Sequence, residues 1–259
     1  MEKISGVIMA YNEEKRIEGC LKSLHPFCDE IVLVDSFSTD LTLDIAASYT
    51  SKIFKRKFDT YVNQRNHAIS LAENNWVFWI DADERVTSDL IEVILRLKSE
   101  GFKADGYTIN RLNYYINGFY KYGGWYPDAK IRLFDKTCGR SGGQDPHDKI
   151  IMKQGARIGK IREDIIHFSY RDLYHQIEKM NQFSSRLASD KIKKGTKLIL
   201  FHMIFNSMLK FLKCYIFQGG FLAGTKGLIH SVVNAFYVFS KYAKLWEMKN
   251  SKPPVFDEK

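Results

Sequence analysis

The chain has 259 residues, of which 45% are hydrophobic and 27% are charged. This composition can build a full globular core, and it excludes a disordered or fibrous protein. The formal net charge of +9 predicts an anionic partner, and charge alone leaves nucleic acid, a phosphorylated substrate and an acidic membrane open.

The cysteines are scattered along the chain without a CxxC pair, at Cys20, Cys28, Cys138 and Cys214. This spacing indicates neither a zinc site nor a disulfide framework, and a reducing compartment fits it best. Residues 1–6 lead directly into a strand-like run and lack the basic-then-apolar profile of a secretory signal. We therefore expect the active domain to be cytoplasmic.

Short apolar runs alternate with segments of helical spacing in the first hundred residues. The runs, rich in branched side chains and typical of buried strands, are 4–10, 30–34 and 76–80. The segments with helical apolar spacing are 17–24, 43–47 and 68–72. This βαβα alternation predicts an α/β fold with a doubly wound, mostly parallel sheet.

A further helix is expected after Thr87 and Ser88, which offer an N-cap, and Gly101 ends it. From 105 to 170 the pattern changes to strands and glycine-rich loops with clustered aromatic residues, which suggests a substrate-recognition half. We expect residues 1–170 to form a nucleotide-binding and catalytic domain and 171–259 to form a helical C-terminal region.

Acidic residues directly follow the strand 76–80, as Asp81-Ala82-Asp83-Glu84. Ligands of open α/β sheets bind beyond the carboxyl ends of the strands, so this position favours a functional site. Asp81 and Asp83 could hold one divalent cation, Mg²⁺ or Mn²⁺, which would offset charge on a departing phosphate. The alternative is a solvated acidic turn, and Glu84 is given no role beyond favouring the start of the next helix.

Three strand ends carry motifs that would converge on one edge of the sheet. They are Ala10-Tyr11-Asn12-Glu13-Glu14, Val34-Asp35-Ser36-Phe37-Ser38-Thr39-Asp40 and the acidic tetrad. In this order they resemble the family-2 glycosyltransferases of the GT-A fold, whose marks are A-Y-N-E-E, V-D-x-x-S-x-D and a later D-x-D. The resemblance covers about residues 4–170.

The resemblance implies roles for the matching positions in binding a nucleotide-activated sugar. It places Tyr11 and Glu13 near the base and ribose, and Asp35 on the base. Asp81 is expected on the ribose and the metal, and Asp83 on the metal. These roles predict a metal-dependent transferase that uses a UDP-sugar.

Three further side chains are candidates for the substrate site. Arg65 matches a basic residue of the family that approaches the nucleotide, and an arginine suits a phosphate or a base edge. The alternative for Arg65 is an exposed helix arginine. Trp125 and Arg132 match positions that line the sugar and face phosphate in the resembling subgroup, whereas a core aromatic and an outward strand charge are their alternatives.

The reaction implied by the family inverts the anomeric carbon and needs a base for the acceptor's proton. The segment Gly142-Gly143-Gln144-Asp145-Pro146-His147-Asp148 crowds three titratable groups beside glycines. The subgroup usually has His-Glu here, so Asp148 is the predicted base and Asp145 the second candidate. An ordinary polar loop is the alternative. His167 and His175 have no partner at ligand spacing and are set aside.

The segment from Thr196 to Trp246 contains lysines but no Asp or Glu, among many large apolar residues. Its longest uncharged stretches, 198–209 and 227–240, are short for a transmembrane helix. Amphipathic helices in the interface of an anionic membrane fit best, and a helical subdomain or oligomer interface is the alternative. Nucleic acid is disfavoured because no dense Lys/Arg stripe or binding module is present.

These patterns together predict a peripheral enzyme on the cytoplasmic face of the cell membrane. The tail segment 217–224 (FQGGFLAG) strengthens the resemblance to bacterial enzymes that add a glucose-type sugar to the lipopolysaccharide inner core, so the expected acceptor is a lipid-linked glycan. A protein or another polysaccharide is the alternative acceptor. A catalytically silent membrane-binding scaffold remains an alternative. A nucleotidyltransferase is disfavoured, because it would need a glycine- and lysine-rich loop after the first strand, where this chain has Tyr11-Asn12-Glu13-Glu14. The oligomeric state is not predicted.

Overall fold

The structure is a computed structural model that describes residues 2–145, 147–193 and 195–251, apart from the side chains of Gln144 and His147. It divides into two compact units. The first comprises residues 1–113 and 127–168, and the second comprises 114–126 and 169–259. The segment 114–126 therefore belongs with the C-terminal helices, although it lies inside the range expected for the catalytic domain.

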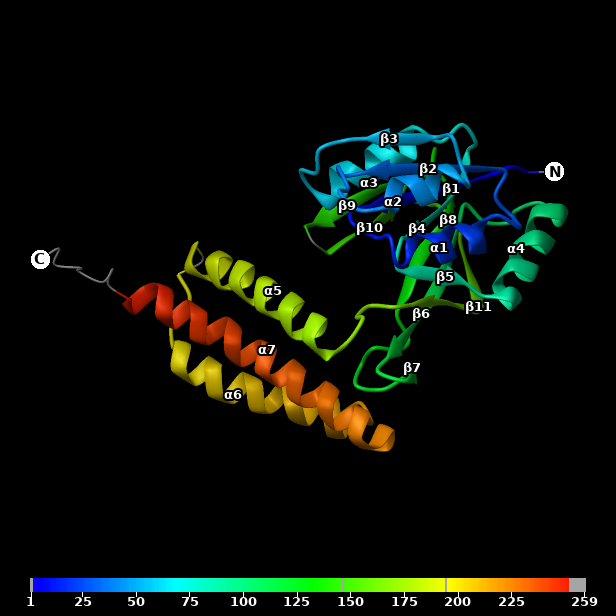
Figure 1. Cartoon of the computed structure of the whole chain (residues 1–259). Coiled ribbons are helices and arrows are strands. Elements are labelled where there is room, and N and C mark those ends of the chain that lie inside the picture. The colour runs from blue at the N-terminus through cyan, green and yellow to red at the C-terminus, as the bar shows by residue number, and fades with distance from the viewer. Residues whose placement is uncertain (1, 146, 194, 252–259) are drawn as a thin grey trace, which may run out of the picture. The chain divides into compact units, whose positions relative to one another are not determined.

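The larger sheet has nine strands in the order β3-β2-β1-β4-β8-β6-β11-β5, with β7 paired to β6 (Figure 1). The strands are β1 (Ile4–Ala10), β2 (Glu30–Asp35), β3 (Ile53–Lys55), β4 (Trp76–Asp81), β5 (Glu84–Val86), β6 (Gly106–Tyr115), β7 (Gly118–Tyr120), β8 (Ala129–Asp135), β9 (Gly139–Gln144), β10 (His147–Met152) and β11 (Ile158–His167). Strands β9 and β10 form a separate antiparallel hairpin.

Helices cover both faces of this sheet because alternate strand residues point to opposite sides. The helices of the first unit are α1 (Ile17–Leu24), α2 (Thr42–Ala47), α3 (Tyr61–Ser70) and α4 (Ser88–Glu100). One buried cluster joins Ile8 and Phe78 to residues of α1, α2 and α4. The other joins Val7 and Val77 to Ala68 of α3. The predicted α/β, GT-A-type fold with a C-terminal helical extension is confirmed.

The parallel register aligns the strand ends that carry the sequence motifs. Ala10 pairs with Asp35 across β1 and β2, and Met9 pairs with Asp81 across β1 and β4. The three motifs therefore leave the sheet at the same edge, as predicted. Strand β8 runs antiparallel to β4 and β6 and supplies residues to this edge from the other direction.

The second unit contains α5 (Leu173–Lys193), α6 (Ile199–Leu212), a π-helical turn at Lys213–Phe217, a 3₁₀ turn at Gly220–Ala223 and α7 (Gly224–Asn250). Helix α7 packs against both α5 and α6 (Figure 1). The buried hydrophobic cluster between these three helices is small and comprises Ala188, Met203, Tyr242 and Leu245. Lys244 of α7 adds a polar clamp, because its Nζ donates to the Asn181 carbonyl at 2.6 Å and to Ser184 Oγ at 2.8 Å.

The glycines of the tail segment allow a close crossing of the chain over α7. A Cβ on Gly227 would lie 1.7 Å from the carbonyl oxygen of Gly220, so no larger residue fits there. Gly219 and Gly224, at φ +67° and +56°, take backbone conformations that favour glycine. The glycines at these positions therefore join α6 to α7 by a tight turn.

Helix α6 continues into the π-helical turn, so that Ile199–Phe217 forms one helical stretch of 19 residues. In the described part of the chain, this stretch alone is long and apolar enough by composition to cross a membrane. Only 11% of its 18-residue apolar window is buried within the protein. The uncharged stretch 198–209 read from the sequence is shorter because Lys210 ends it and Lys213 follows one turn later.

The second unit also buries a histidine among aromatic rings. The His230 ring lies 4.3 Å from that of Trp125 and 4.9 Å from that of Tyr120, measured between centroids. Its Nε2 is 3.3 Å from the carbonyl oxygen of Gly123, which defines an Nε2–H donor. Burial lowers the pKa of His230 to about 4, against the opposing effect of the Gly123 hydrogen bond.

We expect this histidine to make the stability of the helical unit depend on pH. The folded protein keeps His230 neutral while the unfolded chain takes up a proton below pH 6.5, so stability falls as pH drops from about 6.5 towards 4. The difference corresponds to roughly 3 kcal/mol. Thermal unfolding of the wild type and His230→Asn across this range checks it. An equally steep loss in the variant would show that another group is responsible.

Candidate active site

The acidic tetrad lies at the turn between β4 and β5, with its three acids in different surroundings. Asp81 ends β4 and its side chain is partly exposed, whereas Glu84 begins β5 and is fully buried. The Asp81 N–H donates to Glu84 Oε2 at 3.0 Å. The expectation that Glu84 only favours the start of a helix is wrong, because α4 begins at Ser88 and Glu84 sits within the sheet.

Buried arginines surround these acids. Arg132 is fully buried and forms an ion pair with Glu84, and its Nη2 lies 3.5 Å from Asp81 Oδ2. Arg65 is only 4% exposed, and its Nη2 lies 3.4 Å from Asp81 Oδ1. Both guanidiniums stack on the ring of Trp79. The distance from Cζ to the ring centroid is 3.9 Å for Arg65 and 3.6 Å for Arg132. Arg65 is therefore not the exposed helix arginine that was its alternative.

The charges at this site set the protonation of the acids. Burial favours the neutral form of Asp81, but the Arg132 and Arg65 guanidiniums outweigh it and lower the pKa of Asp81. For Glu84, burial prevails over the attraction of Arg132 and raises the pKa. Asp81 is thus held as a carboxylate at neutral pH, as a group that binds a cation or a ribose hydroxyl requires.

The hairpin of β9 and β10 brings the predicted base next to this network. Asp148 pairs with the guanidinium of Arg65, and it accepts a hydrogen bond from Ser141 Oγ at 2.9 Å. Arg65 therefore bridges Asp148 and Asp81. Asp145 is exposed, and its Oδ1 accepts the Tyr61 N–H at the start of α3 at 2.7 Å. Of the two candidate bases, only Asp148 contacts the network of Arg65, Arg132, Asp81 and Glu84, which we call the arginine network.

Asp83 lies within the turn itself and has two partners that sequence reasoning missed. Arg16 Nη1 is 3.5 Å from Asp83 Oδ2, and the same guanidinium holds both carboxylate oxygens of Glu13 at 2.6 and 2.7 Å. His167 Nε2, at the end of β11, is 3.6 Å from Asp83 Oδ1. The i,i+3 spacing of Glu13 and Arg16 was a readable signal, whereas nothing local pointed to His167.

The family resemblance of the sequence implies a divalent cation, and the side chains beside Asp83 could hold one. A carboxylate oxygen and an imidazole nitrogen 3.6 Å apart can both contact an ion of the size of Mn²⁺. Asn113 Oδ1 lies 2.9 Å from His167 Nδ1 and orients the ring with Nε2 towards Asp83. Within the described residues no three His, Cys, Asp or Glu side chains form a metal cluster, so substrate and water oxygens would complete the shell.

The first two strand-end motifs hold each other in place. Asn12 Oδ1 accepts the Thr39 N–H at 2.8 Å, and the Asn12 N–H donates to Ser38 Oγ at 2.9 Å. Asp35 is buried and accepts both the N–H and the hydroxyl of Ser38, at 2.8 and 2.5 Å. Tyr11 is 59% exposed at this edge. The motif polar groups thus shape the loops, and Tyr11 offers an open aromatic surface.

Trp125 lies in the second unit and is not part of the arginine network. Its ring packs 5.1 Å from that of Tyr115 and 6.0 Å from that of Tyr170, in addition to the His230 contact. Arg132 is not the outward strand charge that was its alternative, since it is fully buried between Trp79 and Glu84. Its physical role is to neutralise the buried acid beside Asp81.

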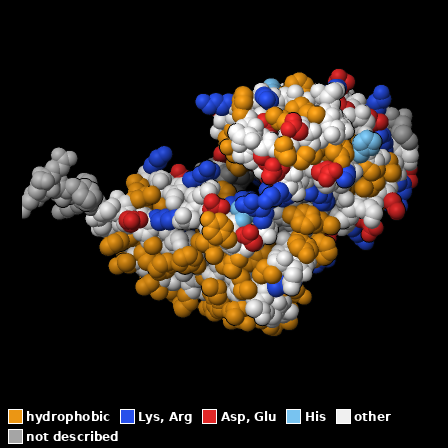
Figure 2. Space-filling model, in the orientation of Figure 1, with side chains coloured by type: hydrophobic (Ala, Val, Ile, Leu, Met, Phe, Trp, Pro, Cys, Tyr) orange, Lys and Arg blue, Asp and Glu red, His pale blue; other side chains and the backbone are white. Residues whose placement is uncertain are grey.

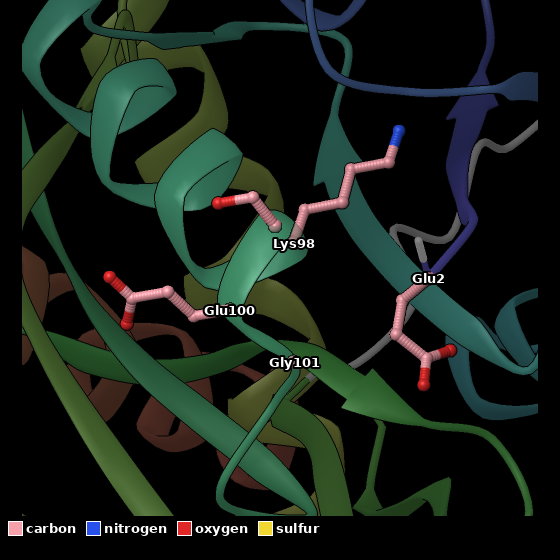
Figure 3. A pocket seen from close by; sticks show the side chains of 5 residues that line it. Glu2, Lys98, Glu100 and Gly101 are labelled. Atoms are coloured by element: carbon pink, nitrogen blue, oxygen red, sulfur yellow. The ribbon is translucent and has the colours of Figure 1, made fainter.

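A shallow depression of about 430 Å³ lies at the opposite edge of the sheet (Figure 3). It is lined by Glu2, Lys98, Ser99, Glu100 and Gly101, near the amino end of β1 and the end of α4. Lys98 Nζ is already occupied by Asp29 Oδ2 at 2.6 Å. None of the predicted site residues lines this depression, so the arginine network at the carboxyl ends of the strands remains the candidate active site.

An α/β sheet with carboxylates and guanidiniums gathered at the carboxyl edge of its parallel strands is typical of an enzyme that binds a phosphorylated nucleotide. The sequence profile described as glycosyl transferase family 2 matches residues 5–156. The chain belongs to this family and is therefore a glycosyltransferase.

Relatives of similar length carry the same assignment. An uncharacterized glycosyltransferase of Rickettsia typhi is 32% identical over 96% of this chain and 88% of its own length. The lipopolysaccharide core biosynthesis glycosyltransferase LpsC of Rhizobium meliloti is 29% identical over 94% of this chain and 92% of its own length.

Solved structures resemble the chain more distantly. Residues 1–349 of TarS from S. aureus align over 98% of this chain and 94% of that chain, at 15% identity and a TM-score of 0.46. Glucosyl-3-phosphoglycerate synthase from Mycobacterium tuberculosis, solved with Mn²⁺, UDP and glucosyl-3-phosphoglycerate, aligns over 44% of each chain at 20% identity and a TM-score of 0.37.

Proposed function

We propose that this glycosyltransferase transfers a glucose-type sugar, with inversion, from a UDP-sugar to a lipid-linked glycan such as the lipopolysaccharide inner core. The observation that carries the proposal is the strand-end network in which Arg65 contacts both Asp81 and Asp148. It brings a candidate donor-binding acid and a candidate base to one guanidinium. The relationship to LpsC along nearly the whole chain supports the lipid-linked acceptor.

The donor would lie along the carboxyl edge of β1, β2 and β4. Tyr11 is exposed where a base can stack on it, and Asp35 and Glu13 shape the loop beside it. Asp81 remains charged and would accept hydrogen bonds from the ribose. Asp83 and His167 would hold Mg²⁺ or Mn²⁺, and that cation, when bound, supplies positive charge to the leaving diphosphate.

Arg65 and Arg132 contribute positive charge close to Asp81. The Nε atoms of Arg65 and Arg132 are buried without a hydrogen-bond partner among the described residues. A diphosphate arriving at Arg65 would compete with Asp148 for the guanidinium, because both are anions that suit its planar donors. Release from Arg65 would leave the Asp148 carboxylate free to take the acceptor's proton.

A lipid-linked acceptor also implies that the enzyme acts at a membrane surface. We place the enzyme on the cytoplasmic face of the cell membrane, as a peripheral protein. The net charge of +9 favours approach to an anionic leaflet.

A donor-hydrolysis screen over UDP-, GDP- and dTDP-sugars tests the proposed chemistry. We expect hydrolysis of UDP-glucose in the presence of Mn²⁺ or Mg²⁺ and its loss on chelation with EDTA, because the cation neutralises the leaving diphosphate. Preference for a GDP- or dTDP-sugar would contradict the donor assignment, and full activity in EDTA would contradict the metal. Absence of any hydrolysis and of UDP binding would favour the silent scaffold.

A further inference from the structure

The outward face of helix α6 consists of large apolar side chains. Two adjacent rows at i,i+4 spacing are exposed along it: Leu200, Ile204 and Met208 in one row, and Phe201, Phe205 and Leu209 in the other. Their exposed fractions run from 40% to 67%. A helix on the surface of a protein in water normally buries such a stripe and exposes the polar one.

Two polar side chains of α6 point towards α7 instead. Asn206 Nδ2 donates to the hydroxyl of Tyr242 on α7 at 3.3 Å, and the His202 ring stacks on that of Tyr242 with centroids 5.4 Å apart. The polarity of α6 is therefore inverted relative to a helix in water. Such an arrangement is stable where the medium outside the helix is apolar.

Helix α7 repeats the inversion on the same unit. Its exposed stripe is Leu228, Val232, Phe236 and Phe239, at close to i,i+4 spacing. On its inner side, His230 and Ser231 are fully buried. Figure 2 shows apolar side chains covering one side of the helical unit, over α6 and α7.

Helix α5 carries exposed charges of both signs, which limit how deep this unit can lie. Glu178, Arg186 and Asp190 are exposed along it, while Met180 and Ala188 are buried. Because α5 packs along α7, a unit drawn fully into a bilayer would take these charges with it, at high cost. A shallow position leaves α5 in water.

The charged residues of α6 and of α7 up to Trp246 have one sign. From Thr196 to Trp246 there is no Asp or Glu, and Lys197 and Lys213 are exposed near the two ends of α6. Lysines beside an apolar face complement anionic lipid phosphates, each contributing on the order of 1 kcal/mol. A second copy of this chain would place the same positive charges against each other.

We propose that α6 and α7 lie flat in the interface of an anionic leaflet, with the two rows of α6 inserted among the acyl chains, the lysines at the phosphates and α5 in water. This deepens the proposed function, since it identifies the surface that docks the enzyme beside a lipid-linked acceptor. This flat orientation differs from a membrane-spanning helix at 199–217. The inner side of α6 already makes polar contacts with α7, so α6 does not leave the unit to cross the bilayer alone.

Flotation with lipid vesicles tests the inserted face. The variant Leu200→Ser/Phe201→Ser/Ile204→Ser removes three exposed side chains from it, and Tyr174→Ser/Ile177→Ser/Ile192→Ser removes three exposed apolar side chains from α5. We expect the wild type and the α5 variant to bind phosphatidylcholine vesicles that contain phosphatidylglycerol. The α6 variant should bind roughly 100-fold more weakly.

Two further measurements test the charge and the orientation. Binding of the wild type should weaken with added salt and be much lower on pure phosphatidylcholine. Alkaline carbonate should release the bound protein, whereas retention would show a spanning helix and overturn the flat orientation. Equal binding by the α6 variant would overturn the inserted face. So would a wild-type dimer in solution that the α6 substitutions dissociate, combined with no vesicle binding.

The test is independent of the sugar chemistry. Hydrolysis of UDP-glucose in solution, without vesicles, should be the same in the wild type and both variants, because the substituted residues lie outside the strand-end network. Vesicle binding without hydrolysis would leave the docking surface supported and the proposed activity refuted. Hydrolysis without vesicle binding would support the proposed activity and refute the docking surface.

Discussion

Asp148→Asn is expected to lower the rate of sugar transfer roughly 1000-fold, whereas UDP binding is preserved or somewhat tighter because the Asp148 carboxylate no longer competes with the diphosphate for Arg65. Asparagine keeps the shape of the side chain but cannot accept the acceptor's proton. Arg65 retains Asp81 as a charged partner at 3.4 Å, so the substitution does not leave its guanidinium without a counter-charge. Transfer rates under saturating donor, together with UDP titrations by calorimetry, separate turnover from binding.

Asp145→Asn is the matched control for this substitution. Asp145 lies on the same hairpin but is exposed, and its contact is the Tyr61 N–H rather than Arg65. We expect its transfer rate to stay within a few-fold of the wild type. Normal transfer by Asp148→Asn would remove Asp148 as the base, and a large loss in Asp145→Asn alone would assign that role to Asp145.

Asp83→Ala is expected to abolish the part of UDP binding that depends on manganese. The substitution removes the carboxylate that faces His167 at 3.6 Å, and a lost ligand should cost more than the 10–100-fold in metal affinity that supporting residues contribute. Affinity for UDP should fall to the value that the wild type shows in EDTA. Calorimetry with UDP, with and without Mn²⁺, measures this difference directly.

Two companion variants make the assignment of the metal site specific. His167→Ala should weaken the manganese-dependent binding in the same direction, because its Nε2 would be the other donor to the cation. Asp89→Ala removes an exposed acid from the first turn of α4 and should change nothing. Manganese-dependent UDP binding that survives in Asp83→Ala would place the cation elsewhere.

The strands and helices of the first unit were predictable because their signals are local. The apolar runs at 4–10, 30–34 and 76–80 lie within the observed β1, β2 and β4. Thr87 accepts the Leu90 N–H at 3.3 Å as an N-cap, and Gly101 ends α4 at φ +81°. Each of these features depends on residues within one or two turns of each other, so the sequence contains the whole signal.

The roles of single charged residues were less predictable, since burial depends on what packs from elsewhere. Glu84 follows Asp83 in an acidic run, yet the antiparallel pairing of β5 with β11 and the arrival of Arg132 from β8 place it in the interior. His167 was set aside for lack of a neighbouring ligand in sequence. The pairing of His167 with Glu84 across these two strands brings it to the tetrad.

The amino-acid sequence by itself determined the class of protein, through three strand-end motifs whose order and spacing define the family. It also determined that the C-terminal region is helical, apolar and basic. Only the tertiary structure decided which sides of those helices face outward, because periodicity shows a stripe but not its direction. The contacts of Asn206 and Tyr242 with each other turn the polar side of α6 inward. In the same way, only packing brought Arg65, Asp81 and Asp148 together, because their charges interact across elements that are distant in sequence.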